Sequence, residues 1–257
     1  MTSMHGTFVW YELMTTDMKA AEDFYRGVVG WGARDAGMPD FSYTLFTVGE
    51  VPAGGLMALP ESARQAGARP GWIGYVAVED VDAGAAKAQE AGGTLHHGPE
   101  DIPGIGRYAM IGDPQGAVIV LFRGIGEAPP VAPGTQGRAG WHELYARDWP
   151  AAFEFYAALF GWAKADALDM GPMGTYQLLT RGGEGEPFGA MMNKPDAVPV
   201  PFWNYYFTVD AIDAAVERVA AGGGQVIFGP QEVPGGSWII QGLDPQGAMF
   251  SLLAPRR

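Results

Sequence analysis

Two glutamates, Glu12 and Glu143, stand in matching surroundings and could carry proton-transfer or binding chemistry. Each follows a tryptophan by two residues, in the segments WYELMTTD from Trp10 and WHELYARD from Trp141. A carboxylate partly removed from water has a raised pKa and can act as a general base or hold a cation. The indoles offer flat faces for stacking a planar molecule. A structural role is the alternative: the glutamates fix their strands through hydrogen bonds to backbone or tyrosine groups, and the tryptophans fill the interior.

The two segments belong to a long internal repeat. Residues 8–31 align with residues 139–162 without gaps, at an offset of 131, and ten of the 24 pairs are identical. The match resumes at the same offset in PGWIGYVAVEDVDAG over PFWNYYFTVDAIDAA and in GDPQGAV over LDPQGAM. A repeat of this length indicates a duplicated domain and is too long for a solenoid unit. We therefore predict one domain over residues 5–123, a Pro- and Gly-rich linker over 124–138 and a second domain over 139–254.

Each copy has the same predicted order of elements. Residues 7–14 alternate as a strand does, and a helix follows, capped by Asp17 and closed by Gly30. Asp148 and Gly161 repeat these signals in the second copy. Further strands are predicted around 42–48, 53–59 and 72–79, with a helix at 81–91, three short strands up to Phe122 and a DPQG turn. The fold class is therefore α+β, with four units of one strand, one helix and two or three strands.

The composition and net charge of the chain limit the kinds of partner that we expect. The chain has 257 residues, 47% hydrophobic residues, no cysteine and a net charge of −13. The charge argues against nucleic acid, because such proteins need a basic face. No apolar run is long enough for a membrane span, and the first residues do not resemble a signal peptide. We expect a cytoplasmic protein with a small-molecule ligand, as a monomer with an internal pseudo-dimer or as a homodimer.

The segments DFYRGVVGW and EFYAALFGW, together with VEDVDAG, VDAIDAA and the DPQG turns, resemble the vicinal oxygen chelate superfamily. This superfamily includes glyoxalase I, extradiol dioxygenases, and bleomycin- and fosfomycin-resistance proteins, and the resemblance covers almost the whole chain in both copies. Within it, the likeness is to two-domain hydroxylase- or glyoxalase-like proteins. The resemblance implies tandem βαβββ modules, with each pair curling a curved mixed sheet around a cavity.

The superfamily's enzymes usually hold a divalent metal in that cavity. By this resemblance, the positions that hold metal ligands in the superfamily are occupied here by residues that are neither histidine nor carboxylate: Trp10, Met57, Ile73, Val120, Trp141, Met191, Asn204 and Ser251. Indole, thioether and aliphatic groups do not hold such ions. We therefore expect no metal and no other cofactor.

The four histidines do not rebuild the site. His5 is expected to be exposed at the terminus, His96 and His97 to lie at a solvated strand end, and His142 to be buried and hydrogen-bonded. A displaced metal site of His142 with Glu143 is the alternative.

Strand alternation selects the residues that would line each implied cavity. In the first domain these include Trp10, Glu12 and Tyr75, with Met14, Ile73 and Val120. In the second domain the lining is more polar, with Trp141, Glu143, Tyr145, Asn204, Tyr206 and Ser251. Glu143 and Glu12 are the candidate catalytic residues and the others are candidate ligand-binding residues. Because a ligand pocket needs a few converging polar groups, we predict that the second domain carries the functional site.

Three functions fit these residues. The first is a protein that binds a small planar or oxygen-rich molecule and acts on it as a metal-independent, hydroxylase- or lyase-like enzyme. The second is a non-catalytic protein that sequesters a ligand or antibiotic, as resistance proteins do. The third is a divalent-metal lyase or dioxygenase with non-standard ligands.

Overall fold

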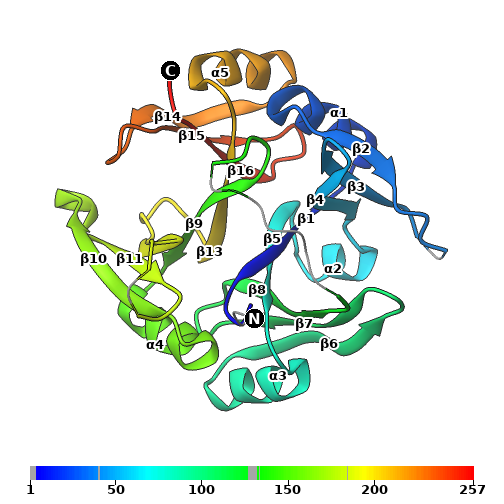
Figure 1. The fold of residues 1–257 in the computed structure, drawn as a ribbon, viewed down its shortest axis with the longest axis vertical. Coiled ribbons are helices and arrows are strands. Elements are labelled where there is room, and N and C mark those ends of the chain that lie inside the picture. Colours follow the sequence, from blue (N-terminus) through cyan, green and yellow to red (C-terminus); the bar gives the residue numbers. More distant parts are fainter. Residues whose placement is uncertain (1–3, 40, 127–131, 133, 184) are drawn as a thin grey trace. The chain divides into compact units, whose positions relative to one another are not determined.

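The computed structural model describes residues 4–39, 41–126, 132, 134–183 and 185–257. Four βαβββ modules follow one another along the chain, two in each repeat (Figure 1). This confirms the α+β class and the tandem modules, with three strands after every module's helix.

The first repeat contains β1 (Phe8–Thr15), α1 (Met18–Val29), β2 (Gly32–Asp35), β3 (Tyr43–Val48), β4 (Val51–Ala58), α2 (Glu61–Gln65), β5 (Gly71–Ala77), α3 (Val81–Glu90), β6 (Thr94–Ile102), β7 (Gly106–Gly112) and β8 (Val118–Gly124). The second contains β9 (Ala139–Ala146), α4 (Trp149–Phe160), β10 (Ala163–Asp169), the short 3-10 helix η1 (Gly171–Met173), β11 (Thr175–Thr180), β12 (Gly189–Asn193), β13 (Phe202–Thr208), α5 (Ile212–Ala221), β14 (Gln225–Glu232), β15 (Trp238–Leu243) and β16 (Met249–Ala254). The predicted linker lies between β8 and β9, and its residues 127–131 and 133 lie outside the described residues.

Both repeats build the same mixed sheet. The strand order is β2-β3-β4-β1-β5-β8-β7-β6 in one sheet and β10-β11-β12-β9-β13-β16-β15-β14 in the other. Within each module the first strand pairs in parallel with the last, as β1 does with β4 and β9 with β12. In β1 and β4 the register sets Glu12 opposite Gly55, and in β9 and β12 it sets Glu143 opposite Ala190.

The predicted helix signals act as expected. Asp17 accepts a hydrogen bond from the amide of Ala20 at 3.0 Å, and Asp148 accepts the matching bond from Ala151 at 3.3 Å. These carboxylates satisfy amides that the first helical turn leaves without a partner. Gly30 ends α1 with a φ of 85°, a left-handed conformation that glycine adopts without steric cost.

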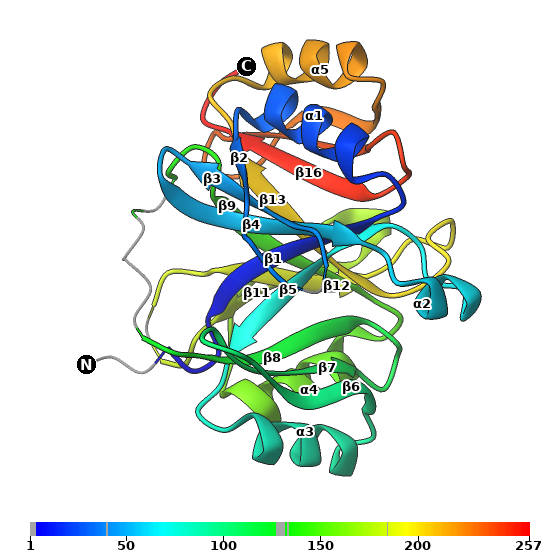
Figure 2. The ribbon, with the colours of Figure 1, turned by 90° about the vertical axis from the view of Figure 1, so that its right-hand side faces the viewer.

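Contacts divide the chain into two compact units, and each unit takes one module from each repeat. The α1/α5 unit contains α1, α5, β2–β4, β14–β16 and most of β1 and β13. The α3/α4 unit contains α3, α4, β6–β8, β10–β12 and most of β5 and β9. In the first unit α1 packs on α5, and in the second α3 packs on α4 (Figure 2). The repeat and the compact unit are therefore different divisions of the same chain.

A buried chain of hydrogen bonds joins the two modules of the α1/α5 unit. Asp244, in the DPQG turn of the second repeat, accepts a bond from the Tyr25 hydroxyl of α1 at 3.2 Å. The indole N–H of Trp72 donates to that same hydroxyl at 2.9 Å. The other carboxylate oxygen of Asp244 accepts from the amides of Gln246 and Ala248 within its own turn. One aspartate thus shapes a turn and fixes a helix of the other repeat.

The α3/α4 unit repeats this chain with the roles of the repeats exchanged. Tyr156 of α4 donates to Asp113 at 3.1 Å, and Trp203 donates to the Tyr156 hydroxyl at 3.0 Å. Both tyrosine side chains are fully buried. Burial is the main cause that raises the pKa of Tyr25, with the charge of Asp244 adding to it, so its hydroxyl keeps the proton that it donates.

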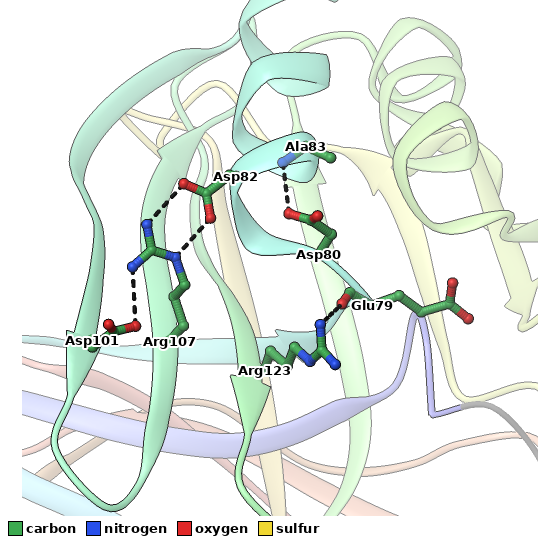
Figure 3. A network of polar contacts seen from close by, with 7 residues as sticks. All are labelled: Glu79, Asp80, Asp82, Ala83, Asp101, Arg107 and Arg123. Atoms are coloured by element: carbon green, nitrogen blue, oxygen red, sulfur yellow. Dashed lines mark hydrogen bonds and ion pairs between the residues drawn. The ribbon is translucent and has the colours of Figure 1, made fainter.

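Surface ion pairs hold the start of α3 (Figure 3). Asp80 caps the helix by accepting from the amide of Ala83 at 2.9 Å. Arg107 of β7 donates to both oxygens of Asp82, at 2.7 and 2.8 Å, and to Asp101 at 3.0 Å. Exposed pairs of this kind contribute little free energy, so we assign this network a local structural role. No helix in the described part of the chain is long and apolar enough to cross a membrane.

We predict that Tyr25→Phe and Tyr156→Phe each lower the free energy of unfolding by about 1–3 kcal/mol, because each leaves a buried aspartate oxygen and a tryptophan N–H without a partner. Urea denaturation at neutral pH measures the change. Tyr108→Phe is the matched control, since that hydroxyl donates to the exposed Glu100, and we expect a change below about 0.5 kcal/mol there. Equal effects for all three variants would contradict the structural role of the buried chain.

Candidate functional site

In the first repeat, Glu12 is held by a tyrosine that sequence reasoning missed. The Tyr43 hydroxyl donates to Glu12 Oε2 at 2.8 Å and accepts from the indole N–H of Trp10 at 3.1 Å. Glu12 is only 4% exposed. Burial raises the pKa of Tyr43 far above its usual value, and the charge of Glu12 raises it further. Tyr43 therefore stays protonated and acts as a constant hydrogen-bond donor to the carboxylate.

Gly55 makes this arrangement sterically possible. A Cβ atom at position 55 would lie 1.9 Å from the Tyr43 hydroxyl oxygen and 2.5 Å from the adjacent ring carbon. The tyrosine therefore crosses the strand face over a residue that has no side chain. A glycine inside a strand is a signal of close approach, and the GG pair of Gly54 and Gly55 could have been recognised in this way.

The second repeat carries a tryptophan and a glutamate at the matching positions of β9. Glu143 is buried, with 4% exposure, and the flanking Trp141 and Tyr145 are partly exposed. Tyr145 stacks on Phe202, with ring centroids 5.2 Å apart and planes 19° from parallel. The register sets Ala190 opposite Glu143, as it sets Gly55 opposite Glu12 in the first repeat.

The remaining predicted residues are also engaged. Asn204 donates to the Ser251 hydroxyl at 2.9 Å, and that hydroxyl donates back to the Asn204 carbonyl oxygen at 3.0 Å. Gln241, which sequence reasoning missed, donates to the Tyr206 hydroxyl at 2.7 Å. Tyr75 contacts Phe122 edge to face, with ring centroids 5.8 Å apart. These bonds satisfy side chains that would otherwise be costly to bury.

The predicted site residues are divided between the two compact units. The α1/α5 unit holds Trp10, Glu12, Trp141, Asn204, Tyr206 and Ser251. The α3/α4 unit holds Tyr75, Glu143 and Tyr145. Within these units the structure joins Trp10 to Glu12 through Tyr43 and joins Asn204 directly to Ser251.

The residues at the family's ligand positions do not fit a divalent metal. The indole nitrogen of Trp10 is a donor bound to Tyr43, and Ile73 and Val120 are buried aliphatic side chains. In β1 and β4 the register sets Met57 opposite Met14. In β9 and β12 the residue opposite Tyr145 is Met192, which follows the expected Met191 by one position. Over the described residues, no three His, Asp or Glu side chains lie close enough together to hold a metal ion.

Two of the histidine predictions are confirmed and one is wrong. His142 is 8% exposed, its Nδ1 bonds the carbonyl of Phe188 at 2.8 Å and its ring stacks on Phe8 at 4.3 Å. His96 and His97 are exposed on β6. His5, expected to be exposed, is partly buried, because its Nε2 bonds the carbonyl of Leu159 at 3.1 Å.

Two surface pockets lie in the α3/α4 unit, and none of the predicted catalytic or ligand-binding residues lines them. One, of about 220 Å³, is lined by His5, Lys87 and the residues around the start of α3. The other, of about 260 Å³, lies beside Lys164 and Thr180.

The chain belongs to the Glyoxalase/Bleomycin resistance protein/Dioxygenase superfamily, whose model matches residues 7–121 and again 138–252. It is 34% identical to "Putative glyoxylase CFP32" of Mycobacterium tuberculosis, over 97% of this chain and 95% of that protein. It is 32% identical to "Anthracycline biosynthesis protein DnrV" of Streptomyces peucetius, over 98% of this chain and 94% of that protein.

Solved structures share the fold at low sequence identity. The 2,3-dioxygenase LapB from Pseudomonas sp. KL28 matches with a TM-score of 0.66 and 16% identity, over 98% of this chain and 93% of LapB. The Mn(II)-bound glyoxalase from Novosphingobium aromaticivorans matches with a TM-score of 0.64 and 17% identity, over 98% of this chain and 82% of that one.

We predict that the burial of His142 makes the free energy of unfolding depend on pH. Burial lowers the pKa of His142 to about 4, whereas the unfolded chain binds the proton at about 6.5. The unfolded state therefore binds more protons as the pH falls from about 6.5 to 4, and up to about 3 kcal/mol of stability is lost over that window.

His142→Gln keeps a donor for the Phe188 carbonyl and cannot titrate, so it should lose less stability over the same window. Urea denaturation at a series of pH values measures this, with His97→Gln as the exposed control. A loss as steep in His142→Gln as in the unmodified protein would show that another group causes it.

Proposed function

We propose that this chain binds a small planar, oxygen-rich molecule on the strand face of the second repeat that carries Trp141, Glu143 and Tyr145, without a divalent metal. The observation that carries the proposal is a buried carboxylate in a strand with a partly exposed aromatic residue two positions before it and two positions after it. Alternation sets these three side chains on one face. The indole would stack on the ligand, and Glu143 would accept a hydrogen bond from a ligand hydroxyl.

The chemical class of the ligand follows from two sources. Charge-assisted hydrogen bonds to a buried carboxylate favour hydroxyl groups over bare aromatic rings. The relative from Streptomyces peucetius is named for anthracycline biosynthesis, and an anthracycline is a fused-ring hydroxyquinone that is planar and rich in oxygen. A hydroxylated quinone of this kind matches the residues on β9, and ligand binding by Asn204, Tyr206 and Ser251 stays a separate prediction.

Glu143 also has the chemistry of a metal-independent general base. A carboxylate that accepts a bond from a phenolic hydroxyl can take its proton when charge develops on the ring. This role distinguishes an enzyme from a protein that only sequesters its ligand. If the protein is an enzyme, Glu143→Gln loses turnover by a larger factor than it loses affinity.

We predict that 1,4-dihydroxyanthraquinone binds the protein and that Trp141→Ala weakens this binding by about 1–3 kcal/mol, because it removes stacking surface. Glu143→Gln keeps the shape and removes the charge, so it should also weaken binding. Trp10→Ala and Glu12→Gln, the matched changes in the first repeat, should alter stability more than affinity.

Titration followed by tryptophan fluorescence and by calorimetry measures the affinities, and chromatography of the incubated probe detects turnover. Stronger loss of binding in the first-repeat variants than in the second-repeat variants would overturn the assignment to β9.

A further inference from the structure

We propose that the pocket at the start of α3 binds a small guanidino carboxylic acid, a molecule with a guanidinium group at one end and a carboxylate at the other. The pocket measures about 220 Å³ and is lined by residues of the α3/α4 unit alone. It shares no residue with the strand face of β9, so the inference goes beyond the proposed function and stands independently of it.

The α1/α5 unit shows what fills the equivalent position beside its own pair of helices. Arg218 of α5 donates from Nε to the carbonyl of Val28, near the end of α1, at 3.0 Å. The guanidinium of Arg218 also lies 3.6 Å from the carboxylate of Asp210. A helix-end carbonyl and a carboxylate both favour a cation that donates hydrogen bonds. In this unit the fold therefore supplies its own guanidinium.

The α3/α4 unit keeps these acceptors and lacks the arginine. The residues that correspond at the offset of 131 are Val28 and Leu159, Asp210 and Glu79, and Arg218 and Lys87. The carbonyl of Leu159 accepts from His5 Nε2 at 3.1 Å. Lys87 is exposed and forms no ion pair or hydrogen bond with any residue that the structure describes. The space that Arg218 occupies in one unit is thus a pocket beside Lys87 in the other.

The charged groups of the pocket match the two ends of the ligand. Glu79 lines it, and Figure 3 shows the Glu79 carboxylate pointing away from Arg123 and from the ion pairs of Arg107. A carboxylate can accept about four hydrogen bonds, so Glu79 can receive two from a guanidinium in addition to its present contacts. Lys87 lies one helical turn after Ala83, on the same face of α3, and would pair with the ligand carboxylate. A guanidinium without a carboxylate would instead add a second cation beside Lys87.

The floor of the pocket suits the hydrocarbon stem between the two ends. Leu121, Leu159 and Phe160 line it and are buried. Gly84 widens the floor, because a Cβ atom there would lie 3.1 Å from Leu121 Cδ1. Its counterpart in α5 is Ala215, which is fully buried. The methylene groups of the ligand would lie on these apolar side chains, as the stem of an arginine side chain does in a protein.

Calorimetric titration of the full chain with L-arginine at low salt tests the inference, because salt screens exposed charges. We expect a dissociation constant of about 1 mM or lower. Agmatine, which lacks the carboxylate, and L-norvaline, which lacks the guanidinium, should each bind at least about fivefold more weakly, since each loses one charged contact. L-arginine that binds no more tightly than L-norvaline would overturn the inference.

Lys87→Arg is the most informative variant, because it keeps the charge and restores the residue type that fills this space in α5. It should weaken L-arginine binding by about tenfold or more, since its own guanidinium would compete for Glu79. Glu79→Gln keeps the shape and removes the charge, so it should abolish the preference for L-arginine over L-norvaline. Lys19→Arg, an exposed change on α1, is the matched control and should leave the affinity unchanged.

Three results would contradict the proposed pocket. They are an unchanged affinity for L-arginine in Lys87→Arg, a loss in Lys19→Arg equal to that in Lys87→Arg, and a full preference for L-arginine retained in Glu79→Gln.

Discussion

The buried aspartates of the two DPQG turns organise each compact unit. Asp113 and Asp244 each accept backbone amides of their own turn and one tyrosine hydroxyl from a helix of the other repeat. An unpaired carboxylate at such depth would cost several kcal/mol, so the tyrosine must remain in place while the unit is folded. Burial raises the pKa of both aspartates, and the amide and tyrosine donors oppose that shift. The duplicated chain thus ties each module to a partner from the other repeat.

The strand faces that lie opposite these helices differ between the two repeats. The helix side is fixed by Tyr25 and Tyr156, which are identical in the two copies and fully buried. The opposite face of β1 and β9 keeps its tryptophan and glutamate, while Gly55 is matched by Ala190. In the first copy the glutamate is bound by Tyr43, and in the second copy it stands on its strand between two partly exposed aromatic residues.

Local patterns in the sequence predict much of this architecture. The repeat, the four modules and the caps at Asp17 and Asp148 follow from identity, periodicity and turn chemistry. The pairing of modules from different repeats could not be predicted in this way. Periodicity shows which face of a helix or strand is apolar, but it does not show which element packs against that face. The bond between Tyr43 and Glu12 joins residues 31 positions apart and depends on a missing side chain. His5 was misplaced for the same reason, since its partner Leu159 lies in the other repeat.

The central claim is that a carboxylate and aromatic rings, not a divalent metal, recognise the ligand. The most direct test compares the affinity for 1,4-dihydroxyanthraquinone before and after exhaustive treatment with a chelator that is then removed, with elemental analysis of both samples. We expect the same dissociation constant in both samples, within about twofold, and well under one transition-metal ion per chain in the untreated protein. One bound zinc, iron, nickel or manganese ion per chain, whose removal abolishes binding and whose return restores it, would contradict the claim.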